Sequence, residues 1–395
     1  MVRQMLKLIW RRKRANGFLV AEIMLTFFVL FVIVSVFLDA SERYRRPNGF
    51  TIENVLNITA HETGATTNMR QQAPVFSRLV LALEDFGEVA DVGLAGWYMY
   101  KRSMNIGTYD IEGGRKVRMN QAYLSDTCRD ILNLQLVRGR WFDVVDDGAQ
   151  DTPVVINEKL AREMFGDEDP LGKTFRRDLR IIGVISDYRL YGEFDELRNL
   201  VIERIVLSPA DTAQSPSQVG AILVRLNRPD TAELNARILV ALQAVEPSWT
   251  YTITPAEDLH DAYFRQSATP YLMAGASSAA LVAMVMLGLL GVLWQNITGR
   301  TREIGLRRAK GATIGNIYTQ IIGEMLIVAT AGILPGIAIV SQLLMMDTLG
   351  FIPLGTHLVA MSLAAVGLYG MVVLCSLYPG YMAMRINPAE ALRYE

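Results

Sequence analysis

Four long apolar stretches separate the polar parts of the chain, and each predicts a helix that crosses a membrane. A spanning helix needs about 20 predominantly apolar residues. The first stretch is longer than the core of a signal peptide and no small-residue cleavage site follows it, so we expect it to be retained as a span. The predicted spans cover residues 18–38, 271–297, 317–345 and 357–380.

The segment between the first two spans, residues 39–268, has the mixed polar and apolar pattern of a water-exposed domain. Its clearest unit begins with the strand-like run 219–226. A capping-box pattern at Asp230 and Glu233 then starts a helix with apolar residues on one face, and residues 250–254 return as a strand. This β-α-β order predicts an α+β fold for the domain.

A further strand and helix precede that unit. Residues 153–156 form a β-branched run, Asn157 is placed to cap a helix that starts at Glu158, and Gly166 is placed to end it. Residues 180–186 then read as a buried strand. The outer domain therefore has a second group of elements apart from the late β-α-β unit.

The outer domain is long enough to form two lobes. We expect one α+β lobe from residues about 50–120 together with 217–258, and a second lobe from about 121–210 inserted between those parts. An amphipathic stretch without turn signals leads into Pro270 and the second span, and the chain leaves the first span after Leu38. These two flanking segments predict helical stalks that join the domain to the membrane.

Basic residues predict the orientation of the spans. The segments 1–17, 298–316 and 381–395 carry Lys and Arg beside apolar stretches, and short positively charged segments stay in the cytoplasm. We therefore expect both termini on the cytoplasmic side, with residues 1–17 forming an amphipathic helix on the membrane surface. A hydrophobic content of 51% with 20% charged residues agrees with a membrane part plus a water-exposed domain.

The basic loop 298–316 is the candidate docking site for a cytoplasmic partner. In a helix, Glu303, Arg307 and Lys310 would share one face, with Glu ahead of Arg in the favourable order. A charged helix at the membrane surface suits the docking of a partner. It suits a simple stop-transfer and orientation signal equally well.

Two acidic residues lie inside predicted spans. Glu22 and Glu324 are each about six to ten residues from a cytoplasmic boundary, a depth of about 9 to 15 Å at 1.5 Å per residue. Such acids pair with a basic group, reach the interface or couple to protons, and we favour the first two over proton coupling. In the third span, Gly332 and Gly336 fit a small-residue packing face, although Pro335 fits a kink equally well.

The sequence offers no residue cluster suited to catalysis, metal binding or a cofactor. Cys128 lies in the polar region and Cys375 in an apolar span, so we expect neither a disulfide framework nor a metal cluster. The three histidines are far apart in the sequence. The phosphate-loop-like sequence GDEDPLGKT has five residues between its glycines instead of four and follows a helix, so we do not expect it to bind ATP. The chain is therefore predicted not to be an enzyme, and its net charge of −1 offers no nucleic-acid-binding face.

Four segments carry a family resemblance: TREIGLRRAKGATIGNI in the basic loop, INPAEALRYE at the C-terminal end, and VVINEKLAREMFGDEDPLGKTF and IIGVISDYR in the outer domain. Together with the order of spans, they resemble the MacB/FtsX-type permeases of ABC transporters, the macrolide-exporter and lipoprotein-release group. The resemblance implies a porter-like lobe with a second lobe inserted, a permease dimer and a separate pair of cytoplasmic ABC ATPase subunits. The ATPase-docking residues that it implies are Arg302, Glu303, Ile304, Gly305, Leu306, Arg307, Arg308, Lys310 and Gly311.

The resemblance leaves two functions open. The first is a permease subunit in the bacterial inner membrane that transmits ATP-driven motion to the outer domain for efflux or extrusion of a peptide, drug or lipoprotein-like substrate. The second is a regulator that transports nothing and transmits the ATPase state to an extracytoplasmic enzyme such as a peptidoglycan hydrolase. The expected partners are the ATPase, a second permease copy or a paralogue, membrane lipid, and a periplasmic adaptor or hydrolase. A lone sensor is disfavoured because its cytoplasmic parts are too short to signal alone.

Overall fold

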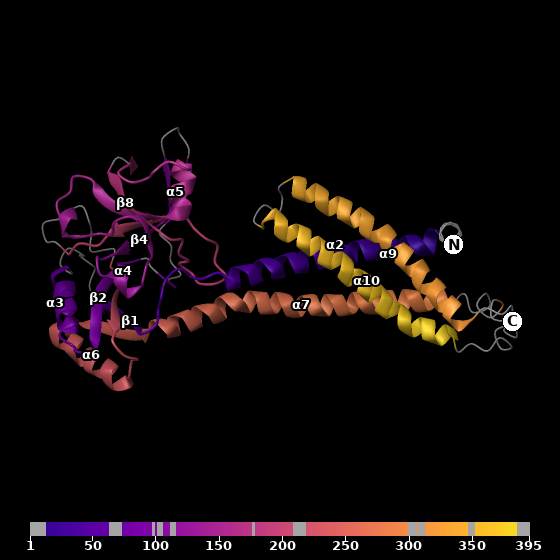
Figure 1. The fold of residues 1–395 in the computed structure, drawn as a ribbon. Helices are drawn as coiled ribbons and strands as arrows, with labels where there is room; N and C mark the ends of the chain where they lie inside the picture. The colour runs from indigo at the N-terminus through magenta and orange to yellow at the C-terminus, as the bar shows by residue number, and fades with distance from the viewer. Residues whose placement is uncertain are drawn as a thin grey trace. The chain divides into compact units, whose positions relative to one another are not determined.

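The computed structural model divides the chain into two compact units (Figure 1). The first comprises Met1–Glu42 with Pro270–Glu395, and the second, the outer domain, comprises Arg43–Thr269. The described residues are 13–62, 73–96, 99–100, 106–110, 116–175, 178–207, 219–298, 306, 313–346 and 352–384.

Four helices supply the membrane-spanning segments, as the apolar pattern predicts. Each is long and apolar enough to cross a bilayer. Each extends beyond the predicted span that it contains, so the limits of the spans remain predictions. The helices are α2 (Lys13–Arg45), α7 (Ala256–Thr298), α9 (Ile314–Met345) and α10 (Leu354–Met384).

Close packing between α2 and α9 depends on two glycines. A Cβ at Gly332 would lie 2.7 Å from Cγ2 of Ile23, and one at Gly336 would lie 2.7 Å from Cδ1 of Phe27. Ile23 and Phe27 are both buried in the core of the bundle. The glycines therefore let the two helices approach closely, which confirms the small-residue packing face predicted in the third span.

The outer domain is built on one mixed sheet. Its strand order is β11-β1-β10-β2-β4-β9-β6-β8-β5, with β3 paired to β4 and β7 paired to β8. The strands are β1 (Val55–Glu62), β2 (Val89–Gly96), β3 (Ile106–Asp110), β4 (Lys116–Leu124), β5 (Leu136–Gly139), β6 (Thr152–Asn157), β7 (Thr174–Phe175), β8 (Leu179–Ile185), β9 (Leu200–Arg204), β10 (Ala221–Leu226) and β11 (Trp249–Pro255).

The predicted β-α-β unit is present as β10, α6 (Ala232–Val245) and β11. The cap of its helix differs from the prediction. Thr231, and not Asp230, is the N-cap residue, and its Oγ1 accepts a hydrogen bond from the N–H of Leu234 at 3.2 Å. Thr231 has extended backbone angles that suit an N-cap. The helix therefore starts one residue later than the predicted capping box at Asp230 and Glu233 indicated.

Besides the short helix α4 (Cys128–Ile131), which packs on β2 and β10, helices cover the sheet in two groups. Helix α3 (Ala73–Glu84) packs beside α6, and together they enclose an apolar core with β1, β2 and β10. Helix α5 (Glu158–Phe165) belongs to a separate core with β6 and β8. The α+β class is as predicted, and β4 connects the two parts of the sheet through an antiparallel contact with β2 and a parallel ladder with β9. The boundaries proposed for two lobes remain a prediction.

Two predicted signals around α5 are confirmed. Asn157 Oδ1 accepts a hydrogen bond from the N–H of Leu160 at 3.2 Å, so it caps the helix. Gly166 ends the helix with a φ of 63°, a left-handed conformation that a side chain would disfavour.

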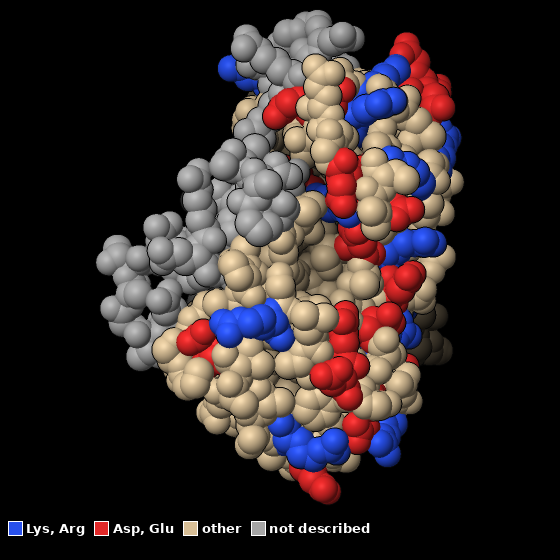
Figure 2. All heavy atoms as spheres, turned by 90° about the vertical axis from the view of Figure 1, so that its left-hand side faces the viewer, with Lys and Arg blue, Asp and Glu red and all other residues tan. Residues whose placement is uncertain are grey.

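The face of the outer domain drawn in Figure 2 carries interleaved acidic and basic side chains. Several of the domain's charges neutralise one another. Glu88, for example, forms ion pairs with both Arg228 and Arg237, at 3.1 and 2.9 Å. A surface that carries both positive and negative charges does not favour the binding of polyanions or of polycations.

Candidate functional site

The predicted docking loop lies mostly outside the described residues. Leu306 is described as helical, with 48% of its surface exposed. Helix α9 begins shortly after it, where Thr313 Oγ1 accepts the N–H of Asn316 at 3.3 Å. The docking role therefore stays a prediction for the whole set. The residues outside the described part are Arg302, Glu303, Ile304, Gly305, Arg307, Arg308, Lys310 and Gly311.

Glu22 lies where α2 passes close to α7. Its Oε1 is 2.7 Å from the position that a Cβ would take at Gly288, so any side chain there would collide with the carboxyl group. One turn further along α2, Thr26 Oγ1 donates a hydrogen bond to the carbonyl oxygen of Glu22 at 2.7 Å. Gly288 thus makes room for an acidic side chain between two helices.

Glu324 is buried within the helical bundle and has a polar partner on its own helix. Only 3% of its surface is exposed, and its Oε1 accepts a hydrogen bond from Nε2 of Gln320 at 2.9 Å. An intramembrane acid is expected to have such a partner. The structure thus gives Glu324 a packing and hydrogen-bonding role that does not require proton transfer.

Replacing Glu324 by glutamine is therefore expected to leave unchanged the ATP-driven function that the family resemblance implies, and its pH profile. Glutamine keeps an acceptor oxygen for Gln320, has nearly the same shape and cannot take up or release a proton. The measurement is the ATP-driven activity of the assembled complex over the pH range in which the wild type is active. If the variant inserts normally but loses activity or shifts its pH optimum, proton coupling through Glu324 gains the support that we withhold from it here.

A third candidate site lies in the outer domain, where segments distant in sequence meet. We call it the junction and define it as the end of α2 at Arg43 and Tyr44, the loop of residues 187–198, and residues 260–264 of α7. Because α2 and α7 are continuous helices that also contain the membrane spans, the junction is where both helices are held by the outer domain.

Arg189 fixes the loop to the end of α2. Its side chain is buried, with 4% of the residue exposed, and its Nη1 donates to the carbonyl oxygen of Arg43 at 2.7 Å and to that of Glu193 at 2.9 Å. The backbone N–H of Arg189 also donates to the carbonyl oxygen of Asn48 at 2.9 Å. A buried guanidinium needs such partners, because an unsatisfied buried charge is costly.

Glu193 fixes the same loop to α7. Its Oε1 accepts a hydrogen bond from Nδ2 of Asn48 at 2.9 Å and lies 2.8 Å from Nε2 of His260. His260 belongs to α7, and Asn48 follows the end of α2. One carboxylate therefore contacts both the chain leaving the first span and the helix that leads into the second.

Three aromatic rings support these polar contacts, one from each part of the junction. The centroids of Tyr44 and Phe194 are 6.0 Å apart, those of Phe194 and Phe264 are 5.6 Å apart, and those of Tyr44 and Phe264 are 6.2 Å apart. Pairs at these separations are stabilising beyond the area that they bury. The two helices and the loop thus share an apolar contact as well as a hydrogen-bonded one.

Electrostatics favour the charged form of Glu193. Burial alone would raise the pKa of this carboxyl group. The hydrogen bonds from His260, from its own backbone amide and from Asn48 outweigh burial and hold the pKa below its ordinary value. Burial lowers the pKa of Arg189, and the nearby Arg46 and Arg43 add to that effect. The junction is thus a compact ionic contact, partly removed from water.

Sequence reasoning predicted the two stalks but missed the loop that joins them. Tyr188, Tyr191 and Phe194 recur every third residue directly after the buried strand β8, among acidic and basic residues. Tyr188 and Tyr191 are buried in the core of the domain, whereas Phe194 contacts both α2 and α7. The usable signal is the loop itself, because loops held by a rigid sheet often carry functional contacts. Its partners were not predictable, since they lie far away in the sequence.

Two family models match the chain. Residues 23–241 match the MacB-like periplasmic core domain, and residues 275–388 match the FtsX-like permease C-terminal region. The chain belongs to the MacB/FtsX family of ABC transporter permeases. With its four apolar helices, it is a multi-pass protein of the inner membrane. The junction lies within the outer domain of this permease, at the ends of the helices that bracket it.

Among curated relatives, the macrolide export ATP-binding/permease protein MacB of Neisseria meningitidis is 27% identical over 276 residues, which cover 67% of this chain and 42% of that protein. The pyoverdine export ATP-binding/permease protein PvdT of Pseudomonas aeruginosa is 26% identical over 290 residues, covering 67% and 40%. An ABC transporter permease, YknZ of Bacillus subtilis, is 25% identical over 283 residues, covering 69% of each chain. This permease thus matches about two-fifths of the length of the first two relatives.

Two solved structures of outer domains are similar to this permease. The periplasmic region of MacB from Actinobacillus actinomycetemcomitans aligns with a TM-score of 0.38 at 17% identity, covering 56% of this chain and 97% of that one. The extracellular domain of YknZ from Gram-positive bacteria aligns with a TM-score of 0.35 at 14% identity, covering 50% and 100%.

Proposed function

We propose that this permease is the membrane subunit of an ATP-driven complex that exports or extrudes a peptide, drug or lipoprotein-like substrate. In this proposal, cytoplasmic ABC ATPase subunits dock on the loop 298–316, and both termini of the permease face the cytoplasm. ATP-driven movement of the spans passes through α2 and α7 into the outer domain. The membership of the family and the names of relatives that combine ATP binding with export support this assignment.

The junction is the observation that carries the proposal. Arg189 holds α2 and Glu193 holds α7 through the same loop. Movement of one helix relative to the other must therefore break these contacts or move the loop. Because the loop directly follows β8 and leads into β9, its displacement acts on the sheet of the outer domain. A permease of this design transmits motion without a catalytic residue of its own.

Isolation of the intact complex tests the proposal. We expect the permease, solubilised from its own host in a mild detergent, to co-purify with an ABC ATPase in equal amounts. A periplasmic adaptor in the same preparation supports export. A peptidoglycan hydrolase in its place supports the regulatory alternative. Recovery of the permease without an ATPase, under conditions that keep known permease complexes intact, contradicts both.

The second proposed partner is another copy of this permease. Helix α7 is the least buried of the four apolar helices. Within the described part of the chain, 6% of its apolar 18-residue segment is buried, compared with 39% for the corresponding segment of α2. Its exposed residues include Gly275, Ala279 and Ala283, spaced four apart. Small residues at this spacing let helices pack closely in lipid, so we place this face of α7 at a dimer interface.

Cross-linking tests the dimer. Cysteine substituted in turn at Gly275, Ala279 and Ala283 is expected to form a disulfide-linked dimer in membranes at one or more of these positions. Both native cysteines are buried and can stay in place. The matched control is cysteine at Leu358, an exposed residue of α10. A homodimer through α7 is ruled out if none of the three positions cross-links, or if the control cross-links equally well.

A further inference from the structure

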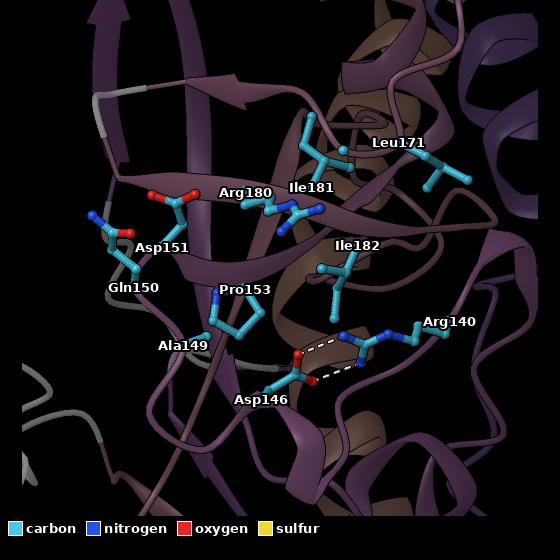
Figure 3. A pocket seen from close by; sticks show the side chains of 11 residues that line it. Arg140, Asp146, Ala149, Gln150, Asp151, Pro153, Leu171, Arg180, Ile181 and Ile182 are labelled. Carbon is cyan, nitrogen blue, oxygen red and sulfur yellow. Dashed lines mark hydrogen bonds and ion pairs between the residues drawn. The ribbon is translucent and has the colours of Figure 1, made fainter.

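The outer domain contains a pocket of about 400 Å³ whose lining residues are all different from those of the junction (Figure 3). Its floor is formed by β6 and β8, which run parallel, with Pro153 directly opposite Arg180. Its wall is the segment 140–151, which connects β5 to β6. A volume of this size suits a small organic ligand.

Ion pairs hold the wall of the pocket in place. Arg140 donates to both carboxylate oxygens of Asp146, at 2.7 and 2.5 Å. The next residue, Asp147, is bound by Arg204 at 2.6 Å, and Arg204 itself is only 5% exposed. Burial would raise the pKa of Asp146, but its hydrogen bonds with Arg140 and the Asp143 backbone lower it. The pocket is therefore preformed, which reduces the entropic cost of binding a ligand.

Backbone groups around the pocket already bond to one another. The N–H of Arg140 donates to the carbonyl oxygen of Ile182 at 3.0 Å, and the N–H of Gly172 donates to that of Ile181 at 2.8 Å. Arg140 and Asp146 also neutralise each other. A ligand in the pocket must therefore be recognised mainly by the remaining side chains.

Two of those side chains have opposite charges and have no partner within the described part of the chain. Asp151 and Arg180 both line the pocket (Figure 3). Among the residues that the structure describes, the side chain of neither one has a hydrogen-bond or ion-pair partner. The pocket also has apolar walls from Leu171, Pro153 and Ile182. Within the described structure, it thus combines one anion and one cation that have no partner with an apolar surface.

We propose that this pocket binds a zwitterionic ligand with an apolar body, of the class of short peptides with free termini. The ligand carboxylate pairs with Arg180, its ammonium group pairs with Asp151, and its apolar side chain contacts Leu171 and Ile182. Charge-assisted hydrogen bonds of this kind are the strong ones. A phosphorylated ligand fits poorly, because Asp151 and Asp146 would face its negative charges.

The test uses the full-length permease in detergent without nucleotide, so its outcome is separate from that of the transport proposal. Calorimetric titration with the dipeptide Leu-Leu is expected to give saturable binding. Acetylation of its amino terminus or amidation of its carboxyl terminus is expected to weaken binding by about tenfold or more, since each removes one ion pair. Absence of saturable binding by Leu-Leu, or equal binding of the free and blocked dipeptides, overturns the proposal.

Two variants test which pocket residue binds each end of the ligand. Asp151→Asn is expected to weaken binding of free Leu-Leu but not of its acetylated form, and Arg180→Gln to weaken binding of the free but not of the amidated form. The matched controls are Asp85→Asn and Arg118→Gln, exposed residues outside the pocket, which should bind as the wild type does. Binding that is unchanged in both pocket variants also overturns the proposal. Because both pocket residues are at least partly exposed and make no side-chain bond to any residue that the structure describes, neither substitution is expected to unfold the domain.

Discussion

Replacing Arg307 and Arg308 together by glutamate is expected to abolish ATP-driven function while the permease still inserts and its outer domain still folds. The change reverses two charges in the loop assigned to ATPase docking. Juxtaposed like charges across an interface cost several kcal/mol, and about 1.4 kcal/mol is a tenfold change in affinity. We therefore expect ATPase affinity to fall on the order of a hundredfold or more, measured by co-purification and by ATP-driven activity.

The matched control for this variant is Lys116→Glu with Arg118→Glu, which reverses two exposed charges on β4 of the outer domain. It should retain the ATPase and full activity. Circular dichroism and membrane fractionation verify that both variants fold and insert. Normal activity with Arg307 and Arg308 reversed would remove the docking assignment and leave the loop as an orientation signal only.

Replacing Arg189 by methionine is expected to uncouple ATP hydrolysis from the action of the outer domain. Methionine keeps the apolar stem but removes the donor that joins the carbonyl oxygens of Arg43 and Glu193. The carbonyl oxygen of Arg43 keeps the N–H of Arg46 at 3.2 Å, so that of Glu193 is the acceptor left without this partner. Each unsatisfied buried acceptor costs about 1 to 3 kcal/mol. The loop 187–198 should loosen from α2, so ATP hydrolysis continues in the complex while export, or activation of the outer enzyme, falls by about tenfold or more.

Two measurements on the same preparation decide this prediction: the ATPase rate of the complex and its ATP-driven activity. Arg118→Met is the matched control, since Arg118 is exposed on β4, and both of its rates should match the wild type. A parallel loss of ATPase rate and activity in Arg189→Met would point to misassembly instead of uncoupling. Unchanged activity, with normal folding, would contradict the transmission role of the junction.

Local signals were sufficient to predict much of the fold. The four spans follow from runs of apolar residues, and the cap at Asn157 and the stop at Gly166 follow from side-chain and backbone preferences within one helix. The misplaced cap of α6 has a local cause as well. Asp230 and Thr231 are adjacent N-cap candidates, and the sequence pattern did not establish which of them takes extended backbone angles.

The candidate sites in the outer domain depended on contacts that no local pattern encodes. Arg43 and Arg189 are 146 residues apart in sequence, and Glu193 and His260 are 67 apart. Their pairing depends on how the sheet brings β8 near the ends of α2 and α7. The pocket has the same origin, because Pro153 and Arg180 become neighbours only through the parallel register of β6 and β8.

The central claim is that ATP binding at a cytoplasmic partner changes the shape of the outer domain through the junction. Pulsed electron paramagnetic resonance between spin labels on Arg118→Cys of the two permease copies tests it directly. Burial raises the pKa of Cys128 to about 11, so this native thiol resists labelling, and Cys375 is also buried. We predict that the distance distribution shifts when ATP is trapped in the complex, and that the shift is lost in Arg189→Met. A distribution that ATP leaves unchanged would contradict the account.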